Sequence, residues 1–331
     1  EADYLDEVAT DISATRIAGL GRSVSPLADL KAFFGLIKTI KTFKPDVIHT
    51  HTAKAGVLGR LASIIAGRGA TRIHTFHGHL LHGYFSGWKT SLVIAIEKFL
   101  AKRTHFLVAI GNEVKQDLLS AGIGSPAQYK VFFPGLPTPH TAGKAELRQK
   151  LGLDAAKIYC TFVGRLTQIK RPDRLLDIAS AMQARGVAIE FLVAGEGELF
   201  AQSQTRAKFE NLSVTFLGWR KDIDALFAAS DIAILTSDNE GIPLTLIQAA
   251  QAGLPIIAPK VGSISDIVEN DVTGFLTSPA PGAMASALSA LATDENLRIQ
   301  LGGAGQKRAS ELFSLERMLR DHTEIYHLAH R

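Results

Sequence analysis

The chain contains one cysteine among its 331 residues, Cys160, which lies in an apolar run typical of a strand. A single cysteine excludes an intrachain disulfide, and the sequence therefore predicts a protein of the reducing cytoplasm. Apolar runs long enough to span a membrane are also lacking, since residues 91–101 are interrupted by Glu97 and Lys98. The predicted location is the cytoplasm, including the inner face of the membrane.

A strong excess of one charge is lacking too. The formal net charge is +4 and the isoelectric point is near 9.1. This balance is too mild to predict nucleic-acid binding, but it suits anionic substrates or a lipid surface. The length predicts two domains, and 46% apolar with 21% charged residues is ordinary for a globular protein.

Strand-like and helix-like segments alternate through the first half of the chain. The expected strands are 15–20, 46–51, 72–76, 106–110 and 129–133, and the expected helices are 25–43, 53–66, 88–102 and 112–121. Such alternation predicts a parallel sheet that is covered on both faces.

Residues 134–139 form the densest cluster of proline and glycine and are the expected interdomain linker. A second alternating series follows. Its expected strands are 158–163, 189–194, 213–217, 231–236, 255–258 and 273–276, and its expected helices are 171–184, 223–229, 244–252, 282–292, 294–311 and 315–329. The pattern predicts an α/β fold of two Rossmann-like domains that face each other across a cleft.

The rest of the second series is organised around residues 231–253, DIAILTSDNEGIPLTLIQAAQAG. A buried strand is followed by a polar turn, and Pro243 stands where its fixed φ suits the first position of a helix that ends at Gly253. The free amides of the helix N-terminus and the carboxylate of Glu240 predict a site for an anionic or polyhydroxylated ligand.

The stretch Ser-x-x-Glu-Gly-x-Pro, followed by Ala-x-Gly-x-Pro-Ile, resembles the donor-sugar motif of retaining GT-B glycosyltransferases, family four (glycosyl transferases group 1). The resemblance implies an acceptor-side domain over 1–136, a nucleotide-sugar domain over 137–313, and a helix over 314–331 that crosses back to the first domain. The chain begins at Glu1 without an initiator methionine, and the resemblance implies an N-terminal domain that lacks its first βαβ unit.

In that family, Glu240 would contact the donor sugar, and a second glutamate seven residues further would bind the ribose. Here the second position is Gln248. Charged hydrogen bonds are worth about 1.5–3 kcal/mol and neutral ones about 0.5–1.5, so roughly tenfold weaker donor binding is expected. The expected donor-binding set also includes four residues after Glu240: Gly241, Ile242, Pro243 and Leu244.

Gly164, Arg165 and Lys170 resemble the family's Gly-Arg-Leu and Lys-Gly motif, although Arg171 follows the lysine in place of glycine. The resemblance places both cations on the donor diphosphate, where they would neutralise the charge that develops on the leaving group. No metal or other cofactor is then required. A solvated basic helix start is the alternative interpretation of these cations.

Histidines are concentrated in the first half, at positions 49, 51, 74, 77, 79 and 82. His77, preferred here to His79, resembles the family's strand-end histidine, which faces the donor sugar and can share the proton passing from acceptor to leaving phosphate. Satisfied core histidines are the alternative for His49 and His74. Zinc ligation is a weaker one, because no aspartate or cysteine set accompanies the histidines.

His51, Lys54 and Arg60 fall on a strand-to-helix turn that the resemblance places on the acceptor side. The two cations are expected to meet a phosphate of a lipid-linked acceptor. Four apolar residues of the helix at 25–43, Phe33, Phe34, Ile37 and Ile40, would form either core or a membrane-docking face, and their helical spacing favours core.

Two further departures concern turns. Ser263 and Asp266 replace the second glycine and the glutamate of the family's Gly-Gly-x-x-Glu turn, so the turn is expected with altered geometry. Asp222 and Asp224 open a short helix, where acidic residues stabilise the N-terminus.

The sequence therefore predicts a retaining, metal-independent glycosyltransferase that moves a sugar from a UDP or GDP donor to a hydroxyl of a saccharide or lipid-linked acceptor. Bacterial envelope polysaccharide or lipopolysaccharide synthesis is the expected setting. A catalytically degenerate or truncated nucleotide-sugar-binding homologue and a nucleotide-sugar 2-epimerase are the alternatives.

Overall fold

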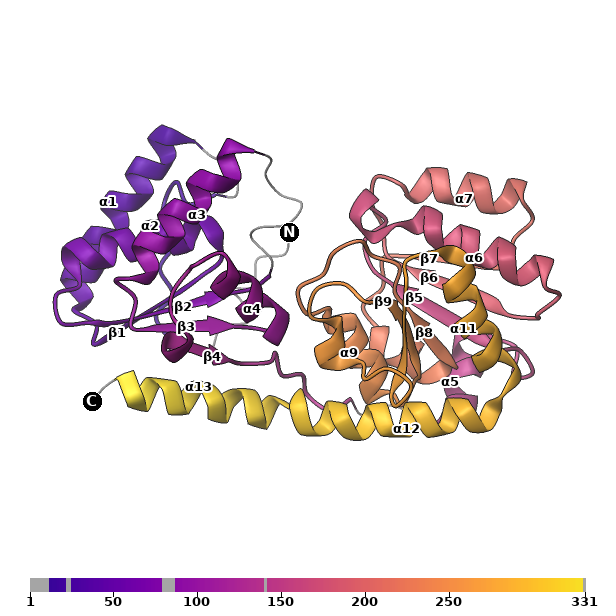
Figure 1. The fold of residues 1–331 in the computed structure, drawn as a ribbon. Coiled ribbons are helices and arrows are strands. Elements are labelled where there is room, and N and C mark those ends of the chain that lie inside the picture. Colours follow the sequence, from indigo (N-terminus) through magenta and orange to yellow (C-terminus); the bar gives the residue numbers. More distant parts are fainter. Residues whose placement is uncertain (1–11, 22–24, 79–86, 140–141, 330–331) are drawn as a thin grey trace.

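The computed structural model describes residues 12–21, 25–78, 87–139 and 142–329. Within them the first domain contains one parallel sheet in the order β1-β2-β3-β4. Its strands are β1 (Val47–His51), β2 (Thr71–Phe76), β3 (Phe106–Ala109) and β4 (Tyr129–Val131), and its α-helices are α1 (Pro26–Phe43), α2 (Ala53–Ala66), α3 (Trp88–Ala101) and α4 (Asn112–Ser120). Helices α1, α2 and α3 lie on one side of this sheet, and α13 lies on the other (Figure 1). The expectation of core packing for α1 holds for Ile40, which is buried, but not for Phe34.

The second domain contains a parallel sheet in the order β10-β9-β8-β5-β6-β7. Its strands are β5 (Tyr159–Val163), β6 (Glu190–Ala194), β7 (Val214–Gly218), β8 (Ile232–Ile234), β9 (Ile256–Pro259) and β10 (Gly274–Thr277). Its helices are α5 (Lys144–Leu151), α6 (Pro172–Ala184), α7 (Phe200–Phe209), α8 (Ile223–Ala229), α9 (Leu244–Gln251), α10 (Ile264–Ile267), α11 (Pro281–Thr293) and α12 (Glu295–Leu312), with a 3₁₀ turn at Gln168–Lys170. The central strands are buried on both faces, as their continuous apolar runs predict.

The chain passes between the domains twice, and the two passages lie side by side. Leu136 of the linker donates its backbone N–H to the carbonyl of Phe313 at 2.9 Å, at the junction of α12 with α13 (Leu315–Ala329). Helices α12 and α13 run along the base of both domains (Figure 1). Ile325 of α13 packs against Ile73 and Val108 of the first sheet. The last helix thereby fastens the second domain to the first.

Three sequence expectations are wrong in detail. Residues 15–20 form a turn rather than a strand, closed by a bond from Leu20 N–H to the carbonyl of Ile17 at 3.3 Å. Helices α5 and α7 were not expected, because each is polar around most of its circumference and buries few side chains. Pro243 is the N-cap of α9 with an extended backbone and not the first helical residue, although the helix begins at Leu244 as expected. In the described part of the chain, no helix has the length and apolar character needed to cross a membrane.

Candidate active site

The loop after β5 carries the first of the expected cations. Gly164 donates its N–H to the carbonyl of Ala194 at 3.0 Å, which holds the loop against the end of β6. Gly195 has φ 134°, and a Cβ there would lie 2.0 Å from the carbonyl oxygen of Gly164, so only glycine allows this contact. The side chain of Arg165 is exposed and makes no ion pair with any residue that the structure describes. It is therefore available to an anion.

Lys170 and Glu240 form an ion pair between the loops that follow β5 and β8. The same carboxylate oxygen of Glu240 accepts a hydrogen bond from Ser237 Oγ at 2.6 Å, and Ser237 is fully buried. Thr236 Oγ1 donates to the carbonyl of Lys170 at 2.8 Å, and Asp238 N–H donates to that of Ile169 at 2.9 Å. The sequence-predicted cation and carboxylate thus belong to one rigid pair of loops.

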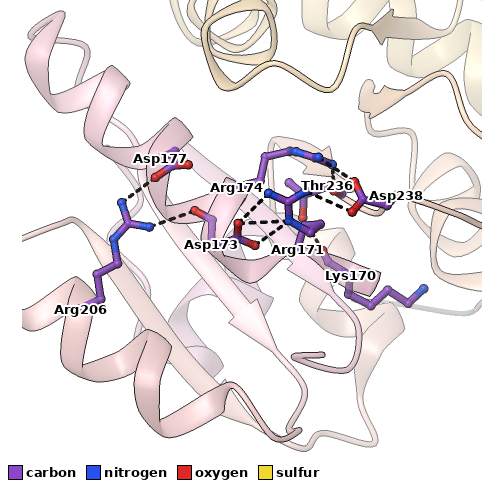
Figure 2. Close-up of polar contacts among 8 residues, drawn as sticks. All are labelled: Lys170, Arg171, Asp173, Arg174, Asp177, Arg206, Thr236 and Asp238. Carbon is purple, nitrogen blue, oxygen red and sulfur yellow. Dashed lines mark hydrogen bonds and ion pairs between the residues drawn. The ribbon is translucent and has the colours of Figure 1, made fainter. Parts of the chain in front are cut away.

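A buried arginine that the sequence reasoning missed supports these loops from behind (Figure 2). Arg174 of α6 donates through Nη1 to the carbonyl of Thr236 at 2.5 Å and through Nη2 to Asp238 Oδ1 at 2.7 Å. Arg171, with φ 52°, donates to the other oxygen of Asp238 at 3.0 Å and to Asp173. Both arginines bind Asp238, which lies far along the chain, so the i, i+3 spacing of Arg171 and Arg174 is the only sequence signal for this arrangement.

Gln248 is held by a carboxylate. Its Nε2 donates to Asp224 Oδ1 at 2.9 Å, which leaves its side-chain carbonyl oxygen as the group that can accept a hydrogen bond. The sequence reasoning gave Asp224 only a role at the start of α8. The structure adds that Asp224 brings a negative charge beside the position at which the family has its second glutamate.

This contact predicts that restoring a glutamate will not strengthen donor binding. In the Gln248→Glu variant, the new carboxylate would face that of Asp224 where Gln248 now donates a hydrogen bond. Repulsion between two carboxylates in a partly buried place costs about 1–2 kcal/mol. We expect UDP affinity, measured by calorimetric titration, to fall by about tenfold. The double variant Gln248→Glu/Asp224→Asn should recover that loss, with Asp224→Asn alone as the control. Tighter binding by Gln248→Glu alone would show that residue 248 does not depend on Asp224.

Three histidines, His49, His51 and His77, form a row near the carboxyl ends of β1 and β2. His51 Nδ1 lies 2.9 Å from His77 Nε2, and the rings of His49 and His51 are 4.2 Å apart. Helix α13 adds two residues that the sequence gave no reason to place here. Tyr326 Oη lies 2.8 Å from His49 Nδ1, and the ring of His322 is 6.4 Å from that of His49.

Partial burial disfavours the charged form of these imidazoles. It lowers the pKa of His49 to about 3 and that of His51 to about 4, with a further lowering from the neighbouring imidazoles. The pKa of His77 is also lowered, first by burial and then by His322. Among the described residues no group of three histidine, cysteine or acidic side chains has an arrangement that would hold a metal ion. Two of the expected histidines, His79 and His82, lie outside the described residues.

The two domains touch beside the Lys170–Glu240 pair. A Cβ on Gly241 would lie 3.1 Å from the carbonyl oxygen of His77 and 3.3 Å from the Cα of Gly78. The two backbones therefore approach closely at Gly241 and Gly78, where neither glycine has a side chain. A second contact joins α10 to α4: Asp266 accepts from the backbone N–H of Asn112 at 2.7 Å and from its side-chain amide at 2.6 Å. The turn at 261–266 forms, and its shorter acid, Asp266, caps a helix of the other domain.

The acceptor-side residues divide into two kinds. Lys54, in the first turn of α2, forms an ion pair with Asp29 of α1 and keeps part of its side chain in solvent. Arg60 is only 1% exposed and donates through Nη2 to both oxygens of buried Glu97 at 2.8 Å. The expectation that Arg60 meets an acceptor phosphate is therefore wrong, because its charge is enclosed between α2 and α3.

The chain has two parallel α/β domains joined by adjacent passages. Cations, a carboxylate and a row of histidines lie at the boundary of the domains. This arrangement defines a nucleotide-sugar glycosyltransferase of GT-B architecture. The family model for glycosyl transferases group 1 matches residues 143–308, and the model for the glycosyl transferase 4-like domain matches residues 2–135. The chain belongs to the glycosyl transferases group 1 family.

Relatives and solved structures agree with this assignment. The chain is 32% identical over 287 residues to UDP-Gal:alpha-D-GlcNAc-diphosphoundecaprenol alpha-1,3-galactosyltransferase from Escherichia coli, covering 83% of this chain and 72% of the relative. It is 24% identical over 314 residues to the capsular polysaccharide biosynthesis glycosyltransferase CapM from Staphylococcus aureus, covering 92% and 82%. The crystal structure of HepE from Anabaena in complex with UDP superposes with a TM-score of 0.79 at 25% identity, covering 92% of this chain and 84% of HepE.

Proposed function

We propose that this glycosyltransferase moves a sugar from a UDP-linked donor to a hydroxyl of a lipid-linked saccharide, with retention at the anomeric carbon, during synthesis of a bacterial surface polysaccharide. The observation that carries the proposal is the contact of His77 and Gly78 with Gly241. It brings the histidine row of one domain beside the Lys170–Glu240 pair of the other, so a sugar bound at Glu240 would face both.

The donor roles follow from the charges at the second domain. Arg165 and Lys170 would bind the diphosphate and neutralise the leaving group, so the transfer needs no metal. Glu240 would accept hydrogen bonds from the sugar hydroxyls, and Gln248 would accept one from the ribose beside Asp224. The residues from Gly241 to Leu244 lead into α9, whose free amides suit an anion. UDP is the proposed nucleotide because HepE is solved with UDP and with UDP-glucose.

The reacting face would be organised by a hydrogen-bonded histidine pair. Because His51 and His77 lie 2.9 Å apart, one imidazole donates and the other accepts, and His51 thereby fixes the tautomer of His77. His77 would then relay the proton from the acceptor hydroxyl toward the leaving phosphate. Glu240 is already engaged by Lys170 and Ser237, which suits a hydrogen-bonding role and a front-face reaction rather than attack on the anomeric carbon.

A lipid-linked acceptor is proposed from the Escherichia coli relative, whose acceptor is named as a diphosphoundecaprenol. On the acceptor side, His51 ends β1 and Lys54 stands in the first turn of α2. We place the enzyme at the cytoplasmic face of the membrane, where a nucleotide donor and a lipid-linked acceptor would meet. None of the relatives reported above supports the epimerase alternative.

Calorimetric titration with UDP, GDP and ADP, each free and sugar-linked, tests the donor half of the proposal. We expect selective binding of the uridine compounds, and a ligand at 100 times its Kd adds about 2.7 kcal/mol to the free energy of unfolding. The Arg165→Ala variant should lose most of this binding. Transfer to a lipid-linked saccharide, with NMR of the product, then reports the anomeric configuration. A chain that melts cooperatively but binds no nucleotide would overturn the proposal and favour the degenerate homologue.

A further inference from the structure

The face of α13 that covers the first sheet carries polar as well as apolar side chains. Ile325 and Ala329 are buried against apolar side chains of the sheet. His322 and Tyr326 stand on the same face of the helix, because positions three and four residues apart are neighbours on a helix surface. The sheet must therefore supply partners for polar rings as well as for apolar side chains.

The partner of Tyr326 is His49, in the middle of β1. Tyr326 Oη lies 2.8 Å from His49 Nδ1, and Thr75 Oγ1 of the neighbouring strand lies 2.7 Å from His49 Nε2. A neutral imidazole, which the burial of His49 favours, has one N–H and one lone pair. One hydroxyl therefore donates to the ring and the other accepts from it. With both nitrogens engaged, the plane and the tautomer of the His49 ring are fixed together.

The ring of His49 stands directly beside that of His51. The two residues are two positions apart on β1, which places their side chains on the same face of the sheet. Their ring centres are 4.2 Å apart, and the ring planes are inclined by 33°. His51 Nδ1 in turn lies 2.9 Å from His77 Nε2. The His51 ring therefore contacts both a neighbour that two hydroxyls hold and the imidazole of His77.

Other contacts already hold α13 on the sheet. Ile325 is buried, and Thr71 Oγ1, at the start of β2, donates to the carbonyl of Ala329 at 2.8 Å. The hydroxyl of Tyr326 instead reaches the histidine row. Helix α13 continues from α12 along the base of both domains, so Tyr326 belongs to the segment that returns from the second domain (Figure 1).

We propose that Tyr326 is a positioning residue for sugar transfer, which acts through His49 to hold the His51–His77 pair in one arrangement. A rotation of the His51 ring would break its contact with His77 and release the tautomer of that imidazole. A proton relay works only when the relaying nitrogen lies within hydrogen-bond reach of the proton. The proposal rests on the proposed function for the role of His77, whereas the contacts themselves do not depend on it.

The Tyr326→Phe variant removes one hydroxyl and keeps the aromatic ring. Loss of one neutral hydrogen bond predicts that kcat for transfer from a UDP-sugar falls by about two- to tenfold, with KM for donor and acceptor unchanged. In the His49→Gln background the amide replaces Nε2 but nothing replaces Nδ1. Tyr326→Phe should therefore have no further effect there. A further loss of kcat in that background would show that Tyr326 does not act through His49.

The matched control is Thr71→Val, which removes a different hydroxyl that anchors α13 and leaves the histidine row untouched. It should lower Tm about as much as Tyr326→Phe does, and it should leave kcat unchanged. If Thr71→Val lowered kcat by the same factor, Tyr326 would be only an anchor of the helix and the proposal would be wrong.

NMR of the histidine ring nitrogens tests the positioning without any transfer reaction. The signals distinguish N–H from lone-pair nitrogens, and the His51→Gln and His77→Gln variants assign them. We expect one tautomer of each ring in the unaltered chain and a mixture in Tyr326→Phe. Unchanged signals in Tyr326→Phe would overturn the proposal. Changed signals in a chain that transfers no sugar would overturn the proposed function and leave the positioning by Tyr326 standing.

Discussion

Replacing Lys170 by alanine is expected to lower kcat/KM for sugar transfer by roughly 10²–10³-fold. In the structure, the ammonium of Lys170 forms an ion pair with Glu240, whose side chain is largely buried. When a donor binds, the same ammonium would turn to the diphosphate, where negative charge grows as the glycosidic bond breaks. The loss should appear in steady-state rates with a UDP-sugar. The matched control is Lys157→Ala, since Lys157 lies in the same domain and is paired with Glu190 at the surface.

The Glu240→Gln variant distinguishes the role of Glu240 from that of Lys170. The amide removes the charge that would accept hydrogen bonds from sugar hydroxyls in the proposed function, and it also releases Lys170. Affinity for free UDP should therefore stay the same or rise, while the preference for UDP-sugar over UDP is lost. Lys170→Ala should weaken both ligands alike. If the two substitutions had the same effect on UDP and UDP-sugar, the division of roles between diphosphate and sugar would be wrong.

The fold could be predicted from the sequence because its strands are parallel and the central ones are buried on both faces. Such strands appear as short apolar runs, for example 159–163 and 190–194, and the helices between them show helical spacing. Helix α7 was missed because only Ser203 and Ala207 are buried along it, so it carries no apolar stripe. Residues 15–20 resemble a strand locally, but a strand is stable only beside a partner.

The sequence predicts part of the site. Local order along the chain places some polar residues, but it does not identify the residues to which they bond. A motif such as residues 237–243 places Glu240 at the carboxyl end of a strand, and that position follows from local order. The hydrogen-bond partners of a polar side chain do not follow from local order. Gln248 meets Asp224, and Arg174 supports Asp238, across loops whose spacing in the chain carries no signal. The sequence therefore indicated candidate residues at the ends of the strands but not the residues that hold them in place.

Arg60→Ala is expected to reduce the free energy of unfolding by about 3–5 kcal/mol, because it leaves the carboxylate of Glu97 buried without its partner. Burial opposes the charged form of both groups, which lowers the pKa of Arg60 and raises that of Glu97, so neither is stable alone. Urea unfolding followed by circular dichroism measures the loss. The exposed Arg68→Ala, just beyond the same helix, is the control and should change stability by less than about 0.5 kcal/mol.

The double variant Arg60→Met/Glu97→Leu distinguishes a structural pair from an acceptor-binding cation. Replacing a buried ion pair by apolar groups of similar volume is often neutral or stabilising, so this variant should recover most of the stability lost in Arg60→Ala. It should also keep its KM for the acceptor, because neither charge reaches solvent. An acceptor-binding Arg60 would behave in the opposite way: the single substitution would fold normally and raise KM, and the double variant would not restore it. The enclosed pair joins α2 to α3, so its main consequence is to fix α3 against α2, the helix whose first turn follows His51.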